Sequence, residues 1–264
     1  MRGAGQPLKT MMDLTGRVAL VTGGAGHIGF QAAAALAELG ARVVLVDLKD
    51  AEAAAAELPD ALGFACDLAD EAAVRALPGQ TVASLGRLDI LVAAAGFVGT
   101  SGLEGWVTPF EEQTADTWRQ AMEVNLTSVF VLAQAALPHL KSGGKGAIVA
   151  VSSIYGMVGP DMRLYDDTPM GNPAAYAAGK GGLLQLVRWL STVVAPEVRV
   201  NAVTPGGIRR GQPEAFVRRY EERTPLRRLG REEELKGAVA YLASDLSSYV
   251  TGQNLVVDGG WTAW

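Results

Sequence analysis

The chain has 264 residues, 49% of them hydrophobic and 19% charged, a composition typical of one globular domain that excludes a disordered or low-complexity protein. The formal net charge of −5 argues against a broad basic surface, so we expect neither nucleic acid nor a membrane as a partner. The chain has a single cysteine, Cys66, which excludes an intramolecular disulfide, so we expect a reducing, cytoplasmic location. Because it also has only two histidines, we expect no metal site.

The N-terminal dozen residues contain no apolar stretch of the length found in signal peptides. We predict a flexible extension over residues 1–12 and a single domain over residues 13–264, because no linker, repeat or abrupt change of composition divides the remainder. No uncharged apolar run approaches the roughly 20 residues needed to span a bilayer.

Apolar runs rich in Val, Ile and Leu recur along the chain and are typical of strands buried on both faces. These runs cover residues 17–22, 42–46, 88–95, 147–152, 198–204 and 254–257. Segments of helical character lie between them, at residues 28–39, 51–58, 71–85, 115–140, 174–194 and 232–243. The alternation predicts βαβ units and therefore an α/β fold with a parallel sheet.

Two connections are long for such a fold, residues 97–113 and residues 158–173. Long ordered loops in compact domains are more often functional than accidental. Both follow the carboxyl ends of predicted strands, where open α/β sheets bind ligands. We therefore expect these loops to form walls of a substrate site.

A glycine-rich turn follows the first predicted strand and opens a helix. It contains GxGxxG at Gly24, Gly26 and Gly29, where the missing side chains allow a tight turn and a close approach to a pyrophosphate. The N-terminus of the following helix supplies unpaired N–H groups and a partial positive charge. The turn predicts a dinucleotide site; the alternative is a tight turn without a ligand.

Two acidic residues follow strand ends: Asp47 ends the second apolar run, and Asp67, in Ala65-Cys66-Asp67-Leu68, follows a further strand that is not among these runs. Asp47 lies about 20 residues beyond the glycine motif, where a carboxylate bonds the adenosine ribose and repels a 2′-phosphate. No arginine follows it, since Leu48 is next, and this pattern predicts NAD rather than NADP. Asp67 is placed to meet the adenine; the alternatives are a strand-end or cap carboxylate for Asp47 and a helix N-cap for Asp67.

Tyr176 and Lys180 are four residues apart on a predicted helix and therefore project from one face. A phenol has a pKa near 10 and needs a nearby cation to work as a base at neutral pH. Lys180 is placed to lower the pKa of Tyr176. The alternative is an ordinary surface pair.

Together with these residues, further motifs fall in the order found in the single-domain branch of the short-chain dehydrogenase/reductase family. They are Asn125, Ser152-Ser153, Pro205-Gly206, Thr251-Gly252-Gln253 and Asp258-Gly259-Gly260. The chain resembles this family over nearly its whole length. The resemblance implies a doubly wound Rossmann-like fold with a mostly parallel seven-stranded sheet and helices on both faces.

The resemblance also implies roles for residues. Tyr176 would be the acid/base, Lys180 would lower its pKa and hold the ribose, Ser153 would bond the substrate oxygen, and Asn125 would support a proton-relay water. The cofactor NAD would be held by Gly23, Gly26, His27, Ile28, Gly29, Asp47, Asp67, Leu68, Ala94, Gly96, Tyr176, Lys180, Pro205, Gly206 and Ile208.

The sequence departs from the family pattern at four places. His27 replaces a glycine of the turn, and Ala93-Ala94 replaces the usual Asn-Asn. No threonine follows Pro205-Gly206 at the usual place. Ser153 and Tyr176 are 23 residues apart, a wider separation than is usual, and the surplus is the loop of residues 158–173.

These observations predict an NAD-dependent oxidoreductase that moves a hydride between nicotinamide and a secondary alcohol or ketone, with sugars, polyols and hydroxy acids as candidate substrates. A nucleotide-sugar epimerase or dehydratase and a non-catalytic NAD-binding protein are the alternatives. The resemblance implies a homo-oligomer, either a dimer or a tetramer.

A substrate lid is expected around residues 206–225. It carries Arg209 and Arg210, whose guanidinium groups suit an anionic substrate. The alternative is that Glu214, Glu221 and Glu222 pair with the arginines on a solvated helix. Asp161, Asp166 and Asp167 of the other loop would repel an anion if they faced the same pocket.

Overall fold

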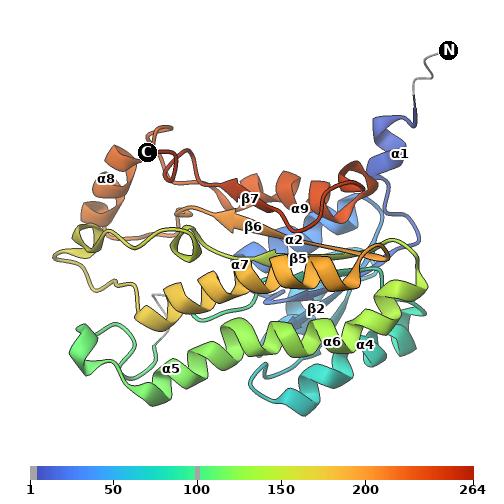
Figure 1. The fold of residues 1–264 in the computed structure, drawn as a ribbon, viewed down its shortest axis with the longest axis horizontal. Coiled ribbons are helices and arrows are strands. Elements are labelled where there is room, and N and C mark those ends of the chain that lie inside the picture. The colour runs from blue at the N-terminus through green and yellow to red at the C-terminus, as the bar shows by residue number, and fades with distance from the viewer. Residues whose placement is uncertain (1–4, 99–101) are drawn as a thin grey trace.

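Seven parallel strands form one sheet in the order β3-β2-β1-β4-β5-β6-β7 in the computed structural model, which describes residues 5–98 and 102–264 (Figure 1). The strands are β1 (Val18–Thr22), β2 (Arg42–Asp47), β3 (Leu62–Ala65), β4 (Ile90–Ala93), β5 (Gly146–Val151), β6 (Val198–Pro205) and β7 (Asn254–Val257). The predicted doubly wound fold is confirmed. The strand order reverses between β1 and β4, and ligands of such sheets bind beyond the carboxyl ends of the strands at this point.

Helices cover both faces of the sheet because side chains alternate along each strand. In β1, Val18 and Leu20 pack with α4 (Glu71–Leu85), α6 (Ser128–Ser142) and α7 (Ala174–Val194). Ala19 and Val21 pack on the opposite face with α2 (His27–Glu38), α3 (Ala51–Ala55) and α9 (Lys236–Ala243). Figure 1 shows these two layers on either side of the strands.

The six predicted strands and six predicted helices agree with observed elements, with differences at their ends, whereas β3 lies outside the six predicted runs. The six predicted strands begin and end within two residues of the observed strands. Residues 94 and 95 leave the sheet after β4, and the predicted helix of residues 51–58 ends early, at Ala55. The predicted helix of residues 232–243 begins with a 3₁₀ turn, η5 (Glu232–Leu235), before α9.

The helix predicted over residues 115–140 is interrupted by a widened turn. α5 (Ala115–Met122) passes into the π-helical segment η2 (Glu123–Thr127), and α6 continues to Ser142. Asn125 lies in η2 and is fully buried. Such π segments often lie at functional sites, because they redirect a side chain without ending the helix.

By length and composition the helical segment Ala115–Ser142 could cross a membrane, and 44% of its most apolar window is buried inside the protein. Its side chains Val131, Leu132 and Ala136 belong to the core beneath the sheet. The apolar character of the helix is therefore used, at least in part, for packing within the domain.

Three segments of irregular chain also contain short helices. Within the predicted extension, α1 (Leu8–Met12) has no buried residue, and residues 1–4 lie outside the described residues. The loop of residues 97–113 contains η1 (Phe110–Glu112), and its residues 99–101 also lie outside the described part. The predicted lid contains α8 (Glu214–Arg223), which buries Phe216, Val217 and Tyr220.

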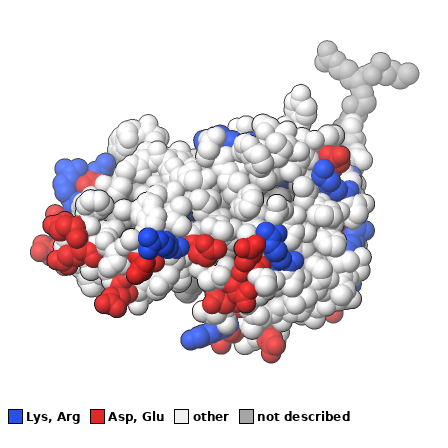
Figure 2. Space-filling view, turned by 60° about the horizontal axis from the view of Figure 1, so that its bottom comes forward, with Lys and Arg blue, Asp and Glu red and all other residues white. Residues whose placement is uncertain are grey.

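Charged side chains are mixed in sign on the surface. Figure 2 shows one face of the molecule, on which blue and red side chains lie together in a band and most of the remaining area is uncharged. Pairs such as Arg75 with Glu71 and Arg119 with Asp116 join neighbouring turns of helices.

Candidate functional site

The glycine turn lies beyond the carboxyl end of β1 and is closed by direct backbone contacts. Gly23 has a φ of +69°, and a Cβ there would lie 2.7 Å from the backbone N of Ala95. A Cβ on Gly29 would lie 2.0 Å from the carbonyl oxygen of Gly23. Gly26 is the N-cap of α2, and no side chain bonds the first N–H groups of that helix there. The turn therefore has the close backbone approach and the polarity that suit a pyrophosphate.

We expect Gly29→Ala to lower the free energy of unfolding by about 2–3 kcal/mol, because the added methyl group overlaps a backbone oxygen in a packed turn. Gly79→Ala is the matched control, since nothing lies within 4 Å of a Cβ at that exposed helical position. The control is expected to be neutral or to stabilise by up to about 1 kcal/mol. Urea denaturation measures both changes, and equal stabilities of the two variants would contradict the steric argument.

Asp47 lies at the end of β2, beside the glycine turn. Its Oδ2 accepts from the N–H of Ala25 at 3.1 Å, and its Oδ1 accepts from the N–H of Leu48 at 2.8 Å. The carboxylate is thus attached to the turn, at the place where a ribose would follow the pyrophosphate.

Asp67 is exposed, and its Oδ1 accepts from the N–H of Ala69 at 2.9 Å. The N-cap of α4 is Asp70, which accepts from the N–H of Ala73. The alternative reading of Asp67 as the helix cap is therefore wrong.

His27 joins the glycine turn to the predicted lid. Its Nδ1 lies 2.9 Å from Oε1 of Glu232, and the Nε of Arg210 donates to the same oxygen at 2.8 Å. Glu232 begins η5, 205 positions after His27. Nothing in the sequence pattern pointed to Glu232, because a glutamate in an acidic run is usually solvated.

The four predicted catalytic residues come from three elements at the carboxyl edge of the sheet. Ser153 follows β5, Asn125 lies in η2, and Tyr176 and Lys180 lie in the first two turns of α7. The Nζ of Lys180 donates to the carbonyl oxygen of Val151 at 2.8 Å and lies 6.0 Å from the ring centroid of Tyr176. The side chain of Ser153 lies close enough to the phenol of Tyr176 to lower its pKa.

Asn125 uses both groups of its amide on the chain that leaves β4. Its Oδ1 accepts from the N–H of Phe97 at 2.7 Å, and its Nδ2 donates to the carbonyl oxygen of Phe97 at 3.2 Å. A Cβ on Gly96 would lie 3.0 Å from Oδ1 of Asn125 and 3.5 Å from Nζ of Lys180. The structure thus brings Gly96, Asn125 and Lys180 together.

Burial controls the ionisation of the two central groups. Burial raises the pKa of Tyr176, and the nearby Ser153 opposes this shift in part. Burial lowers the pKa of Lys180 to about 8. Lys180 was expected to lower the pKa of Tyr176. The groups that lower it are instead Ser153 and Arg210, and the pKa of the phenol lies above its usual value because desolvation outweighs them.

The other predicted cofactor residues line the same edge of the sheet. Ala94 donates its N–H to Thr22, and Pro205 ends β6. Gly206 leaves no room for a Cβ, which would lie 2.8 Å from the Cα of Asp258. Ile208 forms a bridge with Gly230, and Leu68 packs against the core.

The arginines of the lid are paired with acidic side chains. Arg209 lies 3.8 Å from Glu214 and 3.7 Å from Glu221, and Arg210 is paired with Glu232. Arg223 is paired with Asp161, so the two loops are tied together. These contacts agree with the ion-paired alternative for Glu214 and Glu221, whereas no ion pair of Glu222 occurs among the described residues. An anionic substrate would have to compete with the pairs that form.

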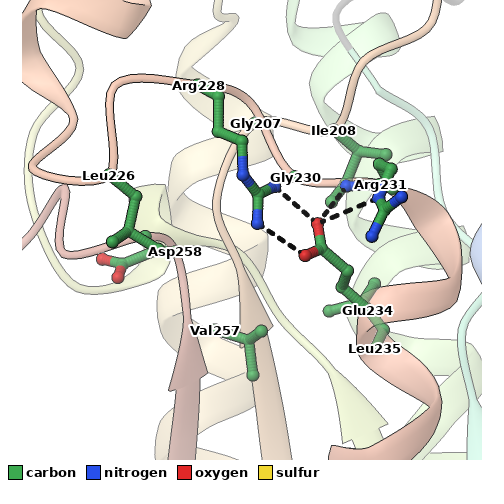
Figure 3. Close-up of a pocket in the computed structure, with 11 residues that line it drawn as sticks. Gly207, Ile208, Leu226, Arg228, Gly230, Arg231, Glu234, Leu235, Val257 and Asp258 are labelled. Carbon is green, nitrogen blue, oxygen red and sulfur yellow. Dashed lines mark hydrogen bonds and ion pairs between the residues drawn. The ribbon is translucent and has the colours of Figure 1, made fainter.

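A cavity of about 90 Å³ lies between the ends of β6 and β7 and residues 226–235. Figure 3 shows Arg228 and Arg231 on two sides of Glu234. Arg228 donates to both carboxylate oxygens of Glu234 at 2.7 and 2.6 Å, and these bonds hold the pKa of Glu234 at about 2. Arg228 and Glu234 neutralise each other within the cavity wall, so this ion pair holds the segment after the lid in place.

Within residues 5–98 and 102–264, no group of three or more His, Cys, Asp or Glu side chains is arranged to hold a metal ion.

The sequence analysis did not identify Tyr155 and Tyr165, whose hydroxyls are 2.9 Å apart. Tyr155 lies two positions after Ser153, and this closeness to a predicted catalytic residue is the sequence feature that could have identified it.

Known proteins match the chain over nearly its full length. A family model described as enoyl-(acyl carrier protein) reductase matches residues 23–262. Cis-4-hydroxycyclohexanecarboxylate dehydrogenase from Sinomonas cyclohexanicum is 40% identical, over 94% of this chain and 97% of the relative. Sorbose reductase from Schizosaccharomyces pombe is 35% identical, over 96% and 99%.

Solved structures agree with this likeness. A short-chain dehydrogenase from Leptospira borgpetersenii with bound NAD⁺ has a TM-score of 0.86 and 31% identity, covering 99% of this chain and 98% of that chain. An NADPH-dependent 3-quinuclidinone reductase from Rhodotorula rubra has a TM-score of 0.86 and 29% identity, covering 100% and 98%.

Proposed function

Because the chain belongs to the short-chain dehydrogenase/reductase family and is an oxidoreductase of secondary alcohols and ketones, we propose that it uses NAD and works through Ser153, Tyr176 and Lys180. The observation that supports these roles is the meeting of the three side chains at the carboxyl edge of the sheet, beside the glycine turn. The glycine positions, where a Cβ would meet backbone atoms, fit the close approach of a dinucleotide.

The proposed chemistry is a proton transfer coupled to a hydride transfer. When bound, the nicotinamide supplies or accepts the hydride at the reacting carbon. Ser153 holds the substrate oxygen by a hydrogen bond. Tyr176 gives its proton to that oxygen in ketone reduction and takes it back in alcohol oxidation. The proton-relay water assigned to Asn125 by family resemblance stays a prediction, and the amide of Asn125 holds the loop at Phe97.

The raised pKa of Tyr176 keeps the phenol protonated near neutral pH, which is the form needed for ketone reduction. Alcohol oxidation needs the phenolate, so its rate should rise with pH. Lys180, still largely protonated at neutral pH with a pKa of about 8, places a positive charge 6.0 Å from the centroid of the ring at that pH.

The proposal is tested by incubating the purified protein with NAD⁺ or NADP⁺ and a panel of secondary alcohols, and with the reduced cofactors and ketones. We expect formation or loss of the reduced nicotinamide, followed by its absorbance. Cofactor binding without turnover of any alcohol or ketone would favour the non-catalytic alternative. The similar proteins named above are dehydrogenases and reductases, which supports oxidoreduction over epimerisation.

The preference for NAD rests on Asp47, which is fixed beside the turn, and on Leu48, which is 59% exposed where an arginine would bind a 2′-phosphate. We predict that wild-type protein has a higher kcat/KM with NAD⁺ than with NADP⁺. Asp47→Ala with Leu48→Arg is expected to move the ratio toward NADP⁺ by tenfold or more, since repulsion is removed and a charged partner is added.

Asp116→Ala is the control for this change, because it also removes one exposed carboxylate but lies on α5. It should leave the ratio unchanged. A wild-type preference for NADP⁺ would show that Asp47 does not select the cofactor.

We also propose a homo-oligomer built on the outer faces of α5, α6 and α7. Trp118, Phe130, Trp189 and Val193 are between 41% and 55% exposed on these helices. Large apolar side chains gathered on one surface are typical of an interface. Light scattering of wild type and Trp189→Glu measures the mass, and a wild-type monomer would contradict the proposal.

A further inference from the structure

A pair of tyrosines lies next to the proposed catalytic serine, and the mechanism above does not use it. Tyr155 lies in η3 (Ile154–Gly156), and Tyr165 ends η4 (Met162–Tyr165) in the surplus loop. Their hydroxyls share one hydrogen bond of 2.9 Å. The backbone N–H of Tyr155 donates to Oγ of Ser153 at 3.2 Å. The tyrosine pair is therefore attached to the proposed active site at Ser153.

The two rings are held by packing, while both residues remain partly exposed. The ring of Tyr155 packs edge-on against Trp261, with centroids 6.2 Å apart, and Tyr165 packs against Phe216 at 5.5 Å. The aromatic residues come from the loop, α8 and the C-terminal segment. Hydroxyls on rings fixed in this way are preorganised for a ligand, because little rotational freedom is lost on binding.

The hydrogen bond between these hydroxyls leaves one donor free. The hydroxyl of Tyr165 donates to the hydroxyl of Tyr155. Each phenol has a single O–H hydrogen, so the hydrogen of Tyr155 has no acceptor among the residues that the structure describes. A hydroxyl that accepts one hydrogen bond is polarised for donating the next. Burial also keeps Tyr155 protonated, with a pKa far above its usual range.

The charges around the site disfavour an anion as the group that this donor binds. Arg209 and Arg210 are paired with Glu214, Glu221 and Glu232, and Arg223 with Asp161. A carboxylate placed among neutral phenols, with these cations already paired, would lose more hydration than one hydrogen bond returns. A neutral hydroxyl group loses far less hydration than a carboxylate.

We propose that Tyr155 is a specificity-determining residue that binds a second hydroxyl of the substrate, next to the reacting carbinol, and that Tyr165 positions it. The substrate class is then a neutral vicinal diol or polyol. This inference rests on the proposed alcohol oxidation at Tyr176 and adds the group that the substrate must carry beside the reacting one.

The test compares 2,3-butanediol with 2-butanol, which lacks only the second hydroxyl. The ratio of their kcat/KM values is measured for wild type, Tyr155→Phe and Tyr165→Phe. In Tyr155→Phe we expect the ratio to fall about tenfold, mostly through a higher KM for the diol, as expected when a uniform binding contact is lost. Tyr165→Phe should lower the ratio by a smaller factor, because Tyr155 keeps its hydroxyl but loses the polarising partner.

Tyr249→Phe is the control, since this tyrosine is fully exposed near the start of the segment leading to β7, and its ratio should equal that of wild type. Circular dichroism melting of each variant reports folding, and Tyr165→Phe keeps the test decisive if Tyr155→Phe does not fold. An unchanged ratio in a folded variant overturns the inference alone, as does a wild-type preference for 3-hydroxybutyrate over the diol. Absence of turnover with every alcohol overturns the proposed function as well.

Discussion

Tyr176→Phe is expected to reduce kcat by at least about 100-fold while leaving the dissociation constant of NAD⁺ within about twofold. General acid–base catalysis contributes about 10²- to 10⁴-fold, and the phenol of Tyr176 is the group whose pKa the nearby Ser153 lowers. The ring remains in the variant, so the packing of α7 should persist. Steady-state kinetics give the rate, and titration calorimetry gives the affinity for the cofactor.

The matched control is Tyr241→Phe, which removes a phenol oxygen from α9 on the opposite face of the sheet. This control should keep wild-type kinetics. Retention of more than about a tenth of the activity in Tyr176→Phe would remove this residue from the proton transfer.

Lys180→Met is expected to lower kcat/KM by about 10- to 100-fold, the size of one charge-assisted hydrogen bond. The same substitution has a distinctive effect on stability. The pKa of Lys180 is lowered from 10.5 to about 8 in the folded protein by burial. Protonated Lys180 therefore costs the folded state about 3 kcal/mol below pH 8, at 1.36 kcal/mol for each pKa unit.

The direction of the pH dependence follows from the number of bound protons. Between about pH 8 and 10.5 the unfolded chain holds the proton and the folded chain does not, so the stability of wild type rises with pH. The methionine variant lacks this group. We expect the free energy of unfolding of wild type minus that of the variant to increase by about 3 kcal/mol across this window.

Urea denaturation at a series of pH values measures this difference. Lys145→Met is the control, because that side chain is 66% exposed and pairs with Asp245 at the surface. A flat difference for Lys180→Met between pH 8 and 10.5 would mean that burial does not lower the pKa of Lys180.

The sequence by itself determined the parallel α/β fold and most of the catalytic group. Buried strands leave a continuous apolar run such as residues 42–46, and a pyrophosphate turn needs glycine at fixed positions, so both patterns are local. Tyr176 and Lys180 share a helix face by their spacing alone. Family resemblance added Asn125 and Ser153, because the residues next to each of them in the sequence match a motif of the family.

Only the tertiary structure decided which groups meet across the chain and how they ionise. Glu232 contacts His27 and Arg210, and the hydroxyl of Tyr165 in the surplus loop contacts that of Tyr155. No helical or strand repeat in the sequence links these residues, so only the packing of the lid and the loop brings them together. The pKa of Tyr176 is raised rather than lowered for the same reason. Desolvation depends on every atom packed around the ring, whereas the spacing of Lys180 describes a single neighbour.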